Sequence, residues 1–180
     1  MVTLKTDRLI LRPFEAGDRD ALFAVFSHPE AMKYWSTPPH ASPEETAQMI
    51  AGSMAADPAT HQEFVILLEG EVIGKAGLWQ VPEIGYILHP DYWRKGIATE
   101  AIGAVLDHAF GTMGLDRVVA DVDPDNTGSI RSLEKLGFRE TGREEKTIEI
   151  NGVWYDSIYF ALTRADWGQA RGGDEKGPPG

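Results

Sequence analysis

The sequence predicts a single α/β domain of the α+β type, in which a mixed sheet carries helices on both faces. Three observations lead to this fold class. A chain of 180 residues with 42% apolar residues suits one domain with a sizeable core. Strand-length apolar runs and helical stripes follow one another in the order βααβββαβαββ, which gives about seven strands and about four helices. No segment repeats another, so the pattern describes one domain and not an array of repeats.

The first third of the chain predicts one strand and two helices. Residues 9–14 are expected to form the strand, and a helix is expected over 18–27 with its apolar residues on one face. Ser42-Pro43-Glu44-Glu45 has a cap, a proline and acids in the order of a helix start, which predicts a second helix over 42–56. The segment between them, 32–41, is aromatic and irregular.

The middle of the chain predicts a meander of three strands. Residues 64–68 and 72–78 are apolar runs joined by Glu69-Gly70-Glu71, which is a hairpin signal. A third strand is expected over 83–88 and stops at His89-Pro90.

A long helix, a strand and a short helix follow the meander. Residues 96–113 carry an apolar stripe of helical period, and Gly114 is expected to close that helix. A buried strand is expected over 117–122 and a short helix over 129–136.

The C-terminal part predicts a long hairpin and a tail. Residues 138–149 and 153–162 flank Asn151-Gly152, the strongest two-residue hairpin signal. Residues 168–180 consist mainly of glycine, proline and charged residues. We therefore expect the folded domain over 1–167 and a flexible tail over 168–180.

Composition excludes several classes of protein. The formal net charge of −11 disfavours nucleic-acid binding, because phosphate backbones are repelled. It favours cationic partners such as amines, although acidity can also serve solubility alone. The chain has no cysteine, no apolar run long enough to span a membrane and no signal-peptide pattern at its start. We expect a cytoplasmic protein without membrane contact, disulfides or thiolate metal sites.

The segment Tyr92-Trp93-Arg94-Lys95-Gly96-Ile97-Ala98-Thr99-Glu100-Ala101 lies where a strand gives way to the long helix. The first turn of a helix leaves four N–H groups without partners, and the helix dipole is positive there. Gly96 removes a Cβ where a ligand must come close, and two cations precede it. We predict a diphosphate seat here. Its residues are Arg94, Lys95, Gly96, Ile97, Ala98 and Thr99.

An ordinary strand–helix turn, with glycine needed only for backbone geometry, is the alternative interpretation of this segment. The aromatic residues, the two cations and the small residue make the segment richer than such a turn. Rossmann and P-loop sites are excluded, because the chain has neither GxGxxG nor GxxxxGK[ST].

The ordered set of motifs resembles the GNAT superfamily of N-acetyltransferases, and within it the RimJ/RimL-like branch that acetylates the N-termini of ribosomal proteins. The matching segments are spread over roughly residues 6 to 163. They are Thr6-Asp7-Arg8-Leu9-Ile10-Leu11-Arg12-Pro13, Glu83-Ile84-Gly85-Tyr86, Tyr92 to Ala101, Asn126 to Ser129, and Gly137-Phe138. The superfamily's binding motif begins with Gln or Arg. Trp93 stands there instead, a departure that this branch commonly shows.

The resemblance implies a twisted, mostly antiparallel sheet that splays apart centrally for acetyl-CoA, between strands 83–88 and 117–122. Backbone groups of Ile87 and Leu88 would pair with the pantetheine arm, and residues 94–99 would hold the pyrophosphate. The implied reaction transfers an acetyl group to a primary amine, and without cysteine the simplest scheme is direct attack in a ternary complex.

Glu83 is the expected general base. A primary amine is mostly protonated near pH 7, so the enzyme must accept a proton. The resemblance places Glu83 on the strand beside the thioester, where it would act through water. The alternative is an edge carboxylate that only stabilises the sheet.

Asn126 and Ser129 are expected to contact the cofactor, with Ser129 also a candidate acid for the leaving thiolate. Asn126 follows Asp123-Pro124-Asp125 and could equally be only a turn residue. Many superfamily members carry a tyrosine acid four residues before the glycine of Gly-Phe. Leu133 occupies that position, which leaves Ser129, Ser132 or water.

The acceptor pocket is expected to include Trp35 and Tyr86 besides Glu83, while core packing explains the remaining aromatics as well. The five histidines show no metal-binding spacing, so no metal site is predicted. The acceptor could be a protein N-terminus or a small amine, and relatives acetylate free amino acids, polyamines and antibiotics. A CoA-binding module without catalysis is the alternative function, and a homodimer through the last hairpin is an open prospect.

Overall fold

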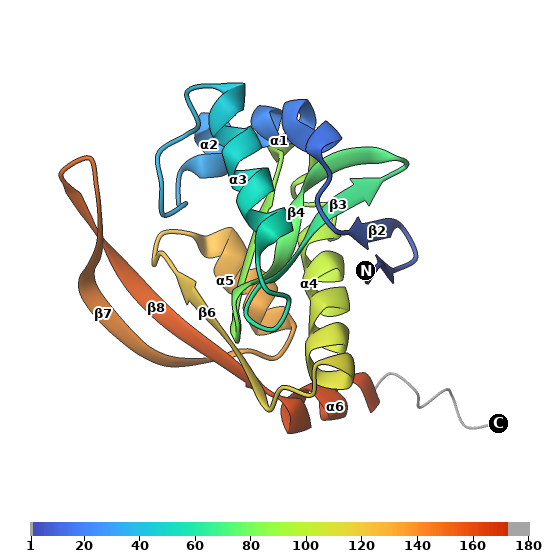
Figure 1. Cartoon of the computed structure of the whole chain (residues 1–180). Helices are drawn as coiled ribbons and strands as arrows, with labels where there is room; N and C mark the ends of the chain where they lie inside the picture. The colour runs from blue at the N-terminus through green and yellow to red at the C-terminus, as the bar shows by residue number, and fades with distance from the viewer. Residues whose placement is uncertain (1, 173–180) are drawn as a thin grey trace.

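The computed structural model describes residues 2–172, in which one eight-stranded sheet is flanked by helices (Figure 1). The sheet order is β1-β2-β3-β4-β5-β6-β8-β7. The strands are β1 (Leu4–Lys5), β2 (Leu9–Arg12), β3 (Gln62–Leu68), β4 (Glu71–Gln80), β5 (Glu83–Leu88), β6 (Arg117–Val122), β7 (Arg139–Ile150) and β8 (Val153–Thr163). The helices are α1 (Arg19–Phe26), α2 (Pro29–Met32), α3 (Pro43–Ala55), α4 (Ile97–Asp107), α5 (Thr127–Lys135) and α6 (Arg164–Gly172). Single turns of 3₁₀-helix at Ala16–Asp18 and Pro90–Tyr92, and of π-helix at His108–Thr112, complete the list.

The predicted fold class is confirmed, and three small elements raise the count above seven strands and four helices. These are the two-residue strand β1, the four-residue helix α2 and the C-terminal helix α6. Helix α6 runs past residue 167, where the tail was expected to begin, because Trp167 is buried and its Nε1 donates to Asp107 Oδ1 at 3.0 Å. The rest of the predicted tail, 173–180, lies outside the described residues.

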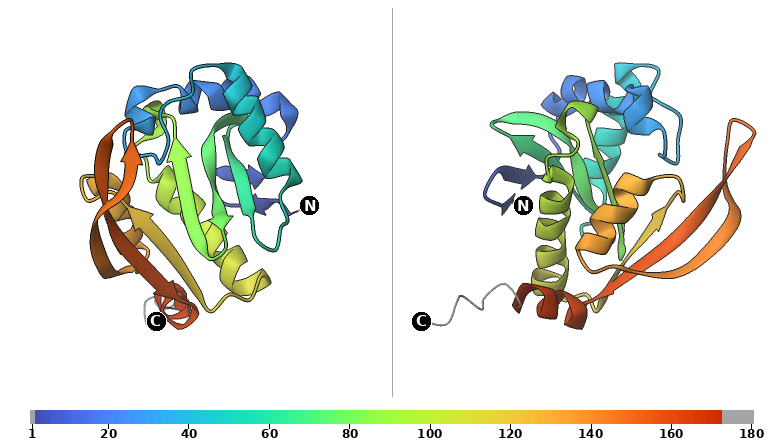
Figure 2. Two further views of the ribbon diagram at one scale, coloured as in Figure 1. Left: turned by 60° about the vertical axis from the view of Figure 1, so that its left-hand side comes forward. Right: turned by 180° about the vertical axis from the view of Figure 1, so that it is seen from behind.

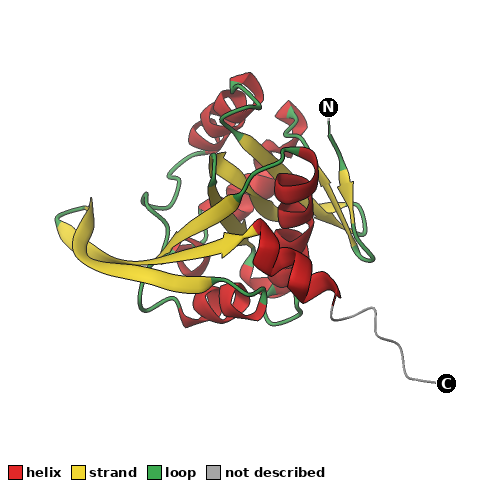
Figure 3. Cartoon of the chain, turned by 90° about the horizontal axis from the view of Figure 1, so that it is seen from below, coloured by secondary structure: helices red, strands yellow, loops and turns green. Residues whose placement is uncertain are grey.

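Two hairpins turn through pairs of residues with positive φ. Glu69 (φ 51°) and Gly70 (φ 89°) join β3 to β4, and Asn151 (φ 51°) and Gly152 (φ 81°) join β7 to β8. Two consecutive residues in this region match the right-handed twist of the strands. The sequence predicts this two-residue turn at Asn151-Gly152, whereas the predicted turn Glu69-Gly70-Glu71 is one residue too long, because Glu71 already belongs to β4. The β7–β8 hairpin curves away from the body of the domain as an arm (Figure 3).

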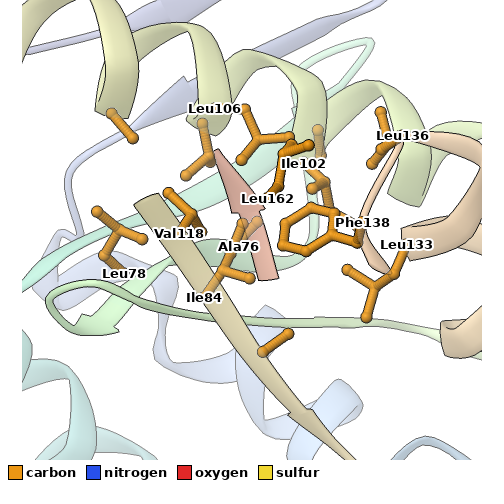
Figure 4. Packing of buried hydrophobic residues seen from close by; sticks show 14 of the residues in the cluster. Ala76, Leu78, Ile84, Ile102, Leu106, Val118, Leu133, Leu136, Phe138 and Leu162 are labelled. Atoms are coloured by element: carbon orange, nitrogen blue, oxygen red, sulfur yellow. The ribbon is translucent and has the colours of Figure 1, made fainter. Parts of the chain in front are cut away.

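Alternating side chains give the sheet a separate core on each face. Phe64 and Ile66 of β3 pack with α4 and α5, in the larger core, part of which appears in Figure 4. Val65, between them, packs with the smaller core formed by α1, α2 and α3. The two views of Figure 2 show these helix groups around the sheet. The predicted apolar stripe of α4 supplies Ile97, Ala101, Ile102, Val105 and Leu106 to the larger core.

The sheet opens between β5 and β6. Neighbouring strands elsewhere in the described sheet run antiparallel, whereas β5 and β6 are parallel and pair only through Glu83 and Val119. The bounds of both strands are those predicted from sequence. Beyond the single pairing point, β5 continues to Leu88 without a partner in β6, so the two strands diverge toward the N-terminus of α4.

Candidate active site

A cavity of about 620 Å³ lies at the open end of the β5–β6 gap. Its walls are the end of β5, the turn before α4 and the start of α5. Nine of the ten residues predicted to bind the cofactor line it, namely Ile87, Leu88, Arg94, Gly96, Ile97, Ala98, Thr99, Asn126 and Ser129. Lys95 does not. Its Nζ lies 5.5 Å from the centre of the ring of Tyr92, which does line the cavity, and its role in the seat stays a prediction. Arg131 lines the cavity and was missed by the sequence analysis.

The turn before α4 contains two residues in the left-handed backbone region, Arg94 (φ 60°) and Gly96 (φ 73°). Such turns direct successive N–H groups into one concavity, which suits an anion at a helix start. From the sequence, Gly96 was expected to leave room for a ligand. The structure corrects this, because a Cβ at Gly96 would face Arg8 Nη2, 3.5 Å away, and Gly96 is required instead for its positive φ.

The backbone of β5 offers fewer free groups than the sequence analysis expected. The His89 N–H donates to the Ile73 carbonyl oxygen at 2.9 Å. Alternation along an antiparallel ladder then directs the backbone of Ile87 toward β4, and that of Tyr86 and Leu88 toward the gap. The Leu88 carbonyl oxygen accepts a hydrogen bond from Trp93 Nε1 at 3.0 Å. The backbone groups of Ile87 are therefore engaged with β4, and the groups of β5 that face the gap are those of Tyr86 and the Leu88 N–H.

The start of α5 faces β5 across the gap. Asn126 is the N-cap of this helix, and its Oδ1 accepts the Ser129 N–H at 3.2 Å. The cap uses the carbonyl oxygen of the Asn126 amide and leaves its NH₂ group for a ligand. The Ser129 hydroxyl is hydrogen-bonded to the Tyr86 hydroxyl. Leu133, the position of the usual tyrosine acid, is fully buried in the larger core.

A second cavity, of about 840 Å³, lies on the face of the sheet that carries α1–α3. Glu83 and Asp121 line it from β5 and β6, and Tyr155 and Ser157 line it from β8. Six described residues line both cavities, so the two meet. They are Lys33, Tyr34, Trp35, Tyr86, Asn126 and Ser129.

Three ionisable groups that line the second cavity have shifted pKa values. Partial burial raises the pKa of Glu83, and the charge of Asp121 adds to the rise. Burial likewise raises the pKa of Asp121. Burial raises the pKa of Tyr86 to about 12, against the opposing effect of its hydrogen bond with Ser129. The Tyr86 phenol is therefore protonated throughout the neutral range.

The lining of the second cavity includes a buried ion pair that the sequence patterns did not indicate. Lys75 Nζ contacts Glu63 Oε1, and the two side chains are 8% and 6% exposed. Lys75 Nζ also lies 5.5 Å from the centre of the Trp35 ring, which packs edge-on against Phe26. Glu63 and Lys75 stand on paired strands two positions apart in register, a signal that pairing of 64–68 with 72–78 could have provided. The contacts hold Trp35 where the two cavities meet.

Comparison with known proteins agrees with this geometry. Residues 8–139 match the family model described as "Acetyltransferase (GNAT) domain". The chain is 32% identical over 171 residues to the uncharacterized N-acetyltransferase YnaD of Bacillus subtilis, covering 91% of this chain and 98% of that one. It is 28% identical over 161 residues to the spermidine N(1)-acetyltransferase of Escherichia coli, with 84% of each chain covered.

Among solved structures, RimJ of Mycobacterium smegmatis in complex with CoA-disulfide superposes with a TM-score of 0.80 at 26% identity, covering 90% of this chain and 87% of that one. No helix within residues 2–172 is long and apolar enough to cross a membrane. The family match extends over most of the chain. The two adjoining cavities could hold a cofactor and an acceptor side by side, as transfer of an acetyl group requires. The chain belongs to the GNAT acetyltransferase family and is an N-acetyltransferase that uses acetyl-CoA.

Proposed function

We propose that the chain acetylates a cationic primary amine by direct attack, where the cofactor cavity and the acceptor cavity meet. The proposal rests on the six residues that line both cavities, because acetyl-CoA and the amine can be in contact beside them. We place the chain in the RimJ/RimL-like branch, on the strength of the sequence motifs and the likeness to RimJ.

The charge of the acceptor cavity supports a cationic acceptor. Glu63 is neutralised by Lys75, which leaves a carboxylate excess along the rest of the wall. Four further carboxylates line the cavity, against one further lysine, Lys33. These carboxylates are Glu83, Asp121, Asp123 and Asp156. An amine that carries a second positive charge, such as a polyamine or a basic peptide N-terminus, is favoured in such a field. The spermidine-acetylating relative acts on an acceptor of this class.

Glu83 is the proposed base. Its side chain lines the acceptor cavity but not the cofactor cavity, so it reaches the amine from the acceptor side. A raised pKa improves a carboxylate as a base for an ammonium proton, provided that it stays ionised at the working pH. Because Glu83 lines the acceptor cavity alone, the proton passes to it through a water molecule in this proposal.

The hydroxyls of Ser129 and Tyr86 are the proposed hydrogen-bond donors to the leaving sulfur. Acetyl-CoA supplies the activated acyl group as a thioester. The hydrogen-bonded hydroxyl pair faces the shared wall and donates to the sulfur as negative charge develops there. Because Leu133 cannot donate a proton, this pair takes the place of the usual tyrosine. The NH₂ group of Asn126 orients the pantetheine arm beside it.

Two further proposals concern assembly and location. The arm formed by β7 and β8 exposes Val153 (53%) and Trp154 (51%), and we propose that a second copy of the chain covers them. Light scattering of the wild type and of Trp154→Ser tests the dimer, which the substitution should weaken.

A cytoplasmic location without nucleic-acid partners remains a prediction from composition.

The proposed reaction is tested with acetyl-CoA and a panel of amines. The panel contains spermidine, a peptide with a basic N-terminal segment, a peptide with an acidic one and a neutral alkylamine. Thiol release and product mass are followed together. We expect acetylation of the cationic acceptors, with higher kcat/KM than for the neutral amine. CoA binding without acetylation of any amine would identify a CoA-binding module instead.

Replacing Glu83 tests the base separately. Glu83→Gln should lower kcat/KM by about 100-fold, since positioned general bases contribute factors of this order. The loss should be greatest at low pH, where the amine is most fully protonated, and CoA affinity should not change. Glu134→Gln, an exposed substitution on α5, is the matched control. Full activity of Glu83→Gln would exclude the base role.

A further inference from the structure

Arg8, between β1 and β2, contacts the cofactor-binding turn from the side away from the ligand. Its Nη1 donates to the Lys95 carbonyl oxygen at 2.9 Å. The cofactor cavity is lined by Gly96 but by neither Arg8 nor Lys95. Arg8 is therefore behind the turn, and its sequence position is 87 residues from the carbonyl that it contacts.

Glu100, in the first helical turn of α4, fixes the Arg8 side chain. Arg8 Nε donates to Glu100 Oε2 at 2.7 Å, and Nη2 lies 2.6 Å from the same oxygen. The Arg8 backbone N–H and the Thr6 hydroxyl both donate to Glu100 Oε1. Burial acts to raise the pKa of Glu100, but the hydrogen bonds from Thr6 and Arg8 outweigh it and lower that pKa. The pair forms a hydrogen-bonded brace between the N-terminal segment and α4.

The peptide between Lys95 and Gly96 connects this brace to the ligand side. The one cis peptide within the described residues is Val81–Pro82, so the Lys95–Gly96 peptide is trans. In a planar trans peptide the C=O and N–H bonds point in opposite directions. A carbonyl held toward Arg8 therefore directs the Gly96 N–H away from Arg8. Within residues 2–172 this N–H has no hydrogen-bond partner.

We infer that Arg8 is a positioning residue that aims the Gly96 N–H at the CoA pyrophosphate, with Glu100 holding Arg8 in place. The inference rests on the proposed assignment of the pyrophosphate to this turn. It explains why a carboxylate stands in the first turn of a helix that binds an anion. Glu100 is neutralised by Arg8, so it orders the turn without repelling the ligand.

A direct contact between the Arg8 guanidinium and a phosphate is the competing explanation. The two differ in what Glu100 does. If Arg8 acts through the peptide, Glu100→Gln loosens the brace and weakens CoA binding. If Arg8 binds phosphate itself, Glu100→Gln frees the guanidinium and strengthens binding.

The experiment compares two acetyl donors, acetyl-CoA and S-acetylpantetheine, which lacks the pyrophosphate. Arg8→Lys keeps the charge but loses the forked geometry. It should raise KM for acetyl-CoA about tenfold with little change in kcat, since one hydrogen bond to a charged group is lost. Its kcat/KM with S-acetylpantetheine should equal that of the wild type. Glu100→Gln should raise KM for acetyl-CoA in the same direction.

Arg19→Lys and Glu134→Gln are the matched controls, because both positions are exposed and neither lines the cofactor cavity. Equal losses with both donors would show a merely structural role and overturn the inference. Tighter CoA binding by Glu100→Gln, or an unchanged KM in Arg8→Lys, would also overturn it. Gly96→Val separates these results from failure of the site itself. If Gly96→Val also binds CoA normally, the proposed pyrophosphate seat is wrong, and not only the role of Arg8.

Discussion

Asp121 and Glu83 face one cavity from neighbouring parallel strands, and the charge of Asp121 raises the pKa of Glu83. Asp121 stands two residues beyond Val119, which pairs with Glu83 at the point where the sheet begins to open. The pairing of Glu83 with Val119 thus holds the two carboxylates near each other, at the point from which the strands diverge toward the proposed cofactor cavity. An acceptor ammonium placed between them would relieve their repulsion.

Asp121→Asn should weaken the binding of cationic acceptors. KM for a polyamine should rise about fivefold, as expected for a half-exposed charge pair, while KM for acetyl-CoA stays constant. Steady-state kinetics with each substrate varied in turn measures both values. A rise in KM for acetyl-CoA of equal size would place Asp121 outside the acceptor site.

The same substitution should stabilise the protein near neutral pH. The folded pKa of Asp121 is raised above its ordinary value of 3.8, so its ionised form is disfavoured by folding. Its favourable contribution is complete below the unfolded pKa and is lost as pH rises through the folded pKa. Asp121→Asn should therefore raise Tm by about 2 °C at pH 7 and by much less at pH 3. Scanning calorimetry at both pH values, with Glu134→Gln as control, decides this.

Tyr86→Phe and Ser129→Ala should each lower kcat about tenfold, because each removes one hydroxyl from the hydrogen-bonded pair at the proposed reaction site. The double variant should lose little more than either single variant, since the two act as a unit. Rapid-mixing measurements of thiol release give kcat for all four proteins.

Ser132→Ala is the matched control for the hydroxyl pair. The Ser132 hydroxyl donates to the Gly128 carbonyl oxygen at 3.0 Å and is already engaged in its own helix. Fully additive losses in the double variant, or a loss in Ser132→Ala as large as in Ser129→Ala, would contradict the role given to the pair. Because the pKa of Tyr86 is about 12, its ionisation should produce no fall in rate below about pH 10.

Gly96→Val should weaken CoA binding at least tenfold. A β-branched residue cannot adopt φ 73° without strain, and relaxation of the turn moves the N–H groups that face the cavity. Titration calorimetry with CoA measures the loss. Gly17→Ala is the control, because its φ lies outside the left-handed region and its Cβ would meet nothing within 4 Å. An unchanged affinity of Gly96→Val for CoA would show that the pyrophosphate does not bind at this turn.

Lys75→Met should destabilise the fold by about 3–5 kcal/mol, since it leaves the buried Glu63 carboxylate without its partner. Adding Glu63→Gln should recover part of the loss, because the second change removes the unpaired charge. Denaturant unfolding of the single and double variants tests the coupling. A double variant no more stable than Lys75→Met would show that the pair is not the cause.

The sequence predicts local structure well where residues that favour turns or end strands coincide with a change in the periodicity of the apolar residues. The bounds of β5 follow from an apolar run that ends at His89-Pro90, and the asparagine-glycine turn is found between β7 and β8. The short elements β1 and α2 are too brief to show a period, and they depend on neighbours that the sequence does not identify.

The site itself was predictable only in part. The turn before α4 is continuous in sequence, so its residues could be assigned together. The sequence did not show that Lys95, alone among residues 94–99, does not line the cavity. By contrast, Arg8 and Glu100 meet across 92 positions, and Tyr86 and Ser129 across 43. Such contacts follow from how the elements pack, which no local pattern encodes.

The single pairing point between β5 and β6 has a consequence for how much soluble protein accumulates in a cell. Beyond Glu83 and Val119, β5 and β6 do not pair with each other within the sheet. Unpaired strand edges promote aggregation, and a ligand that bridges them adds stability by mass action. CoA should therefore raise the yield of soluble protein during expression, and cells starved of pantothenate should accumulate it in insoluble form.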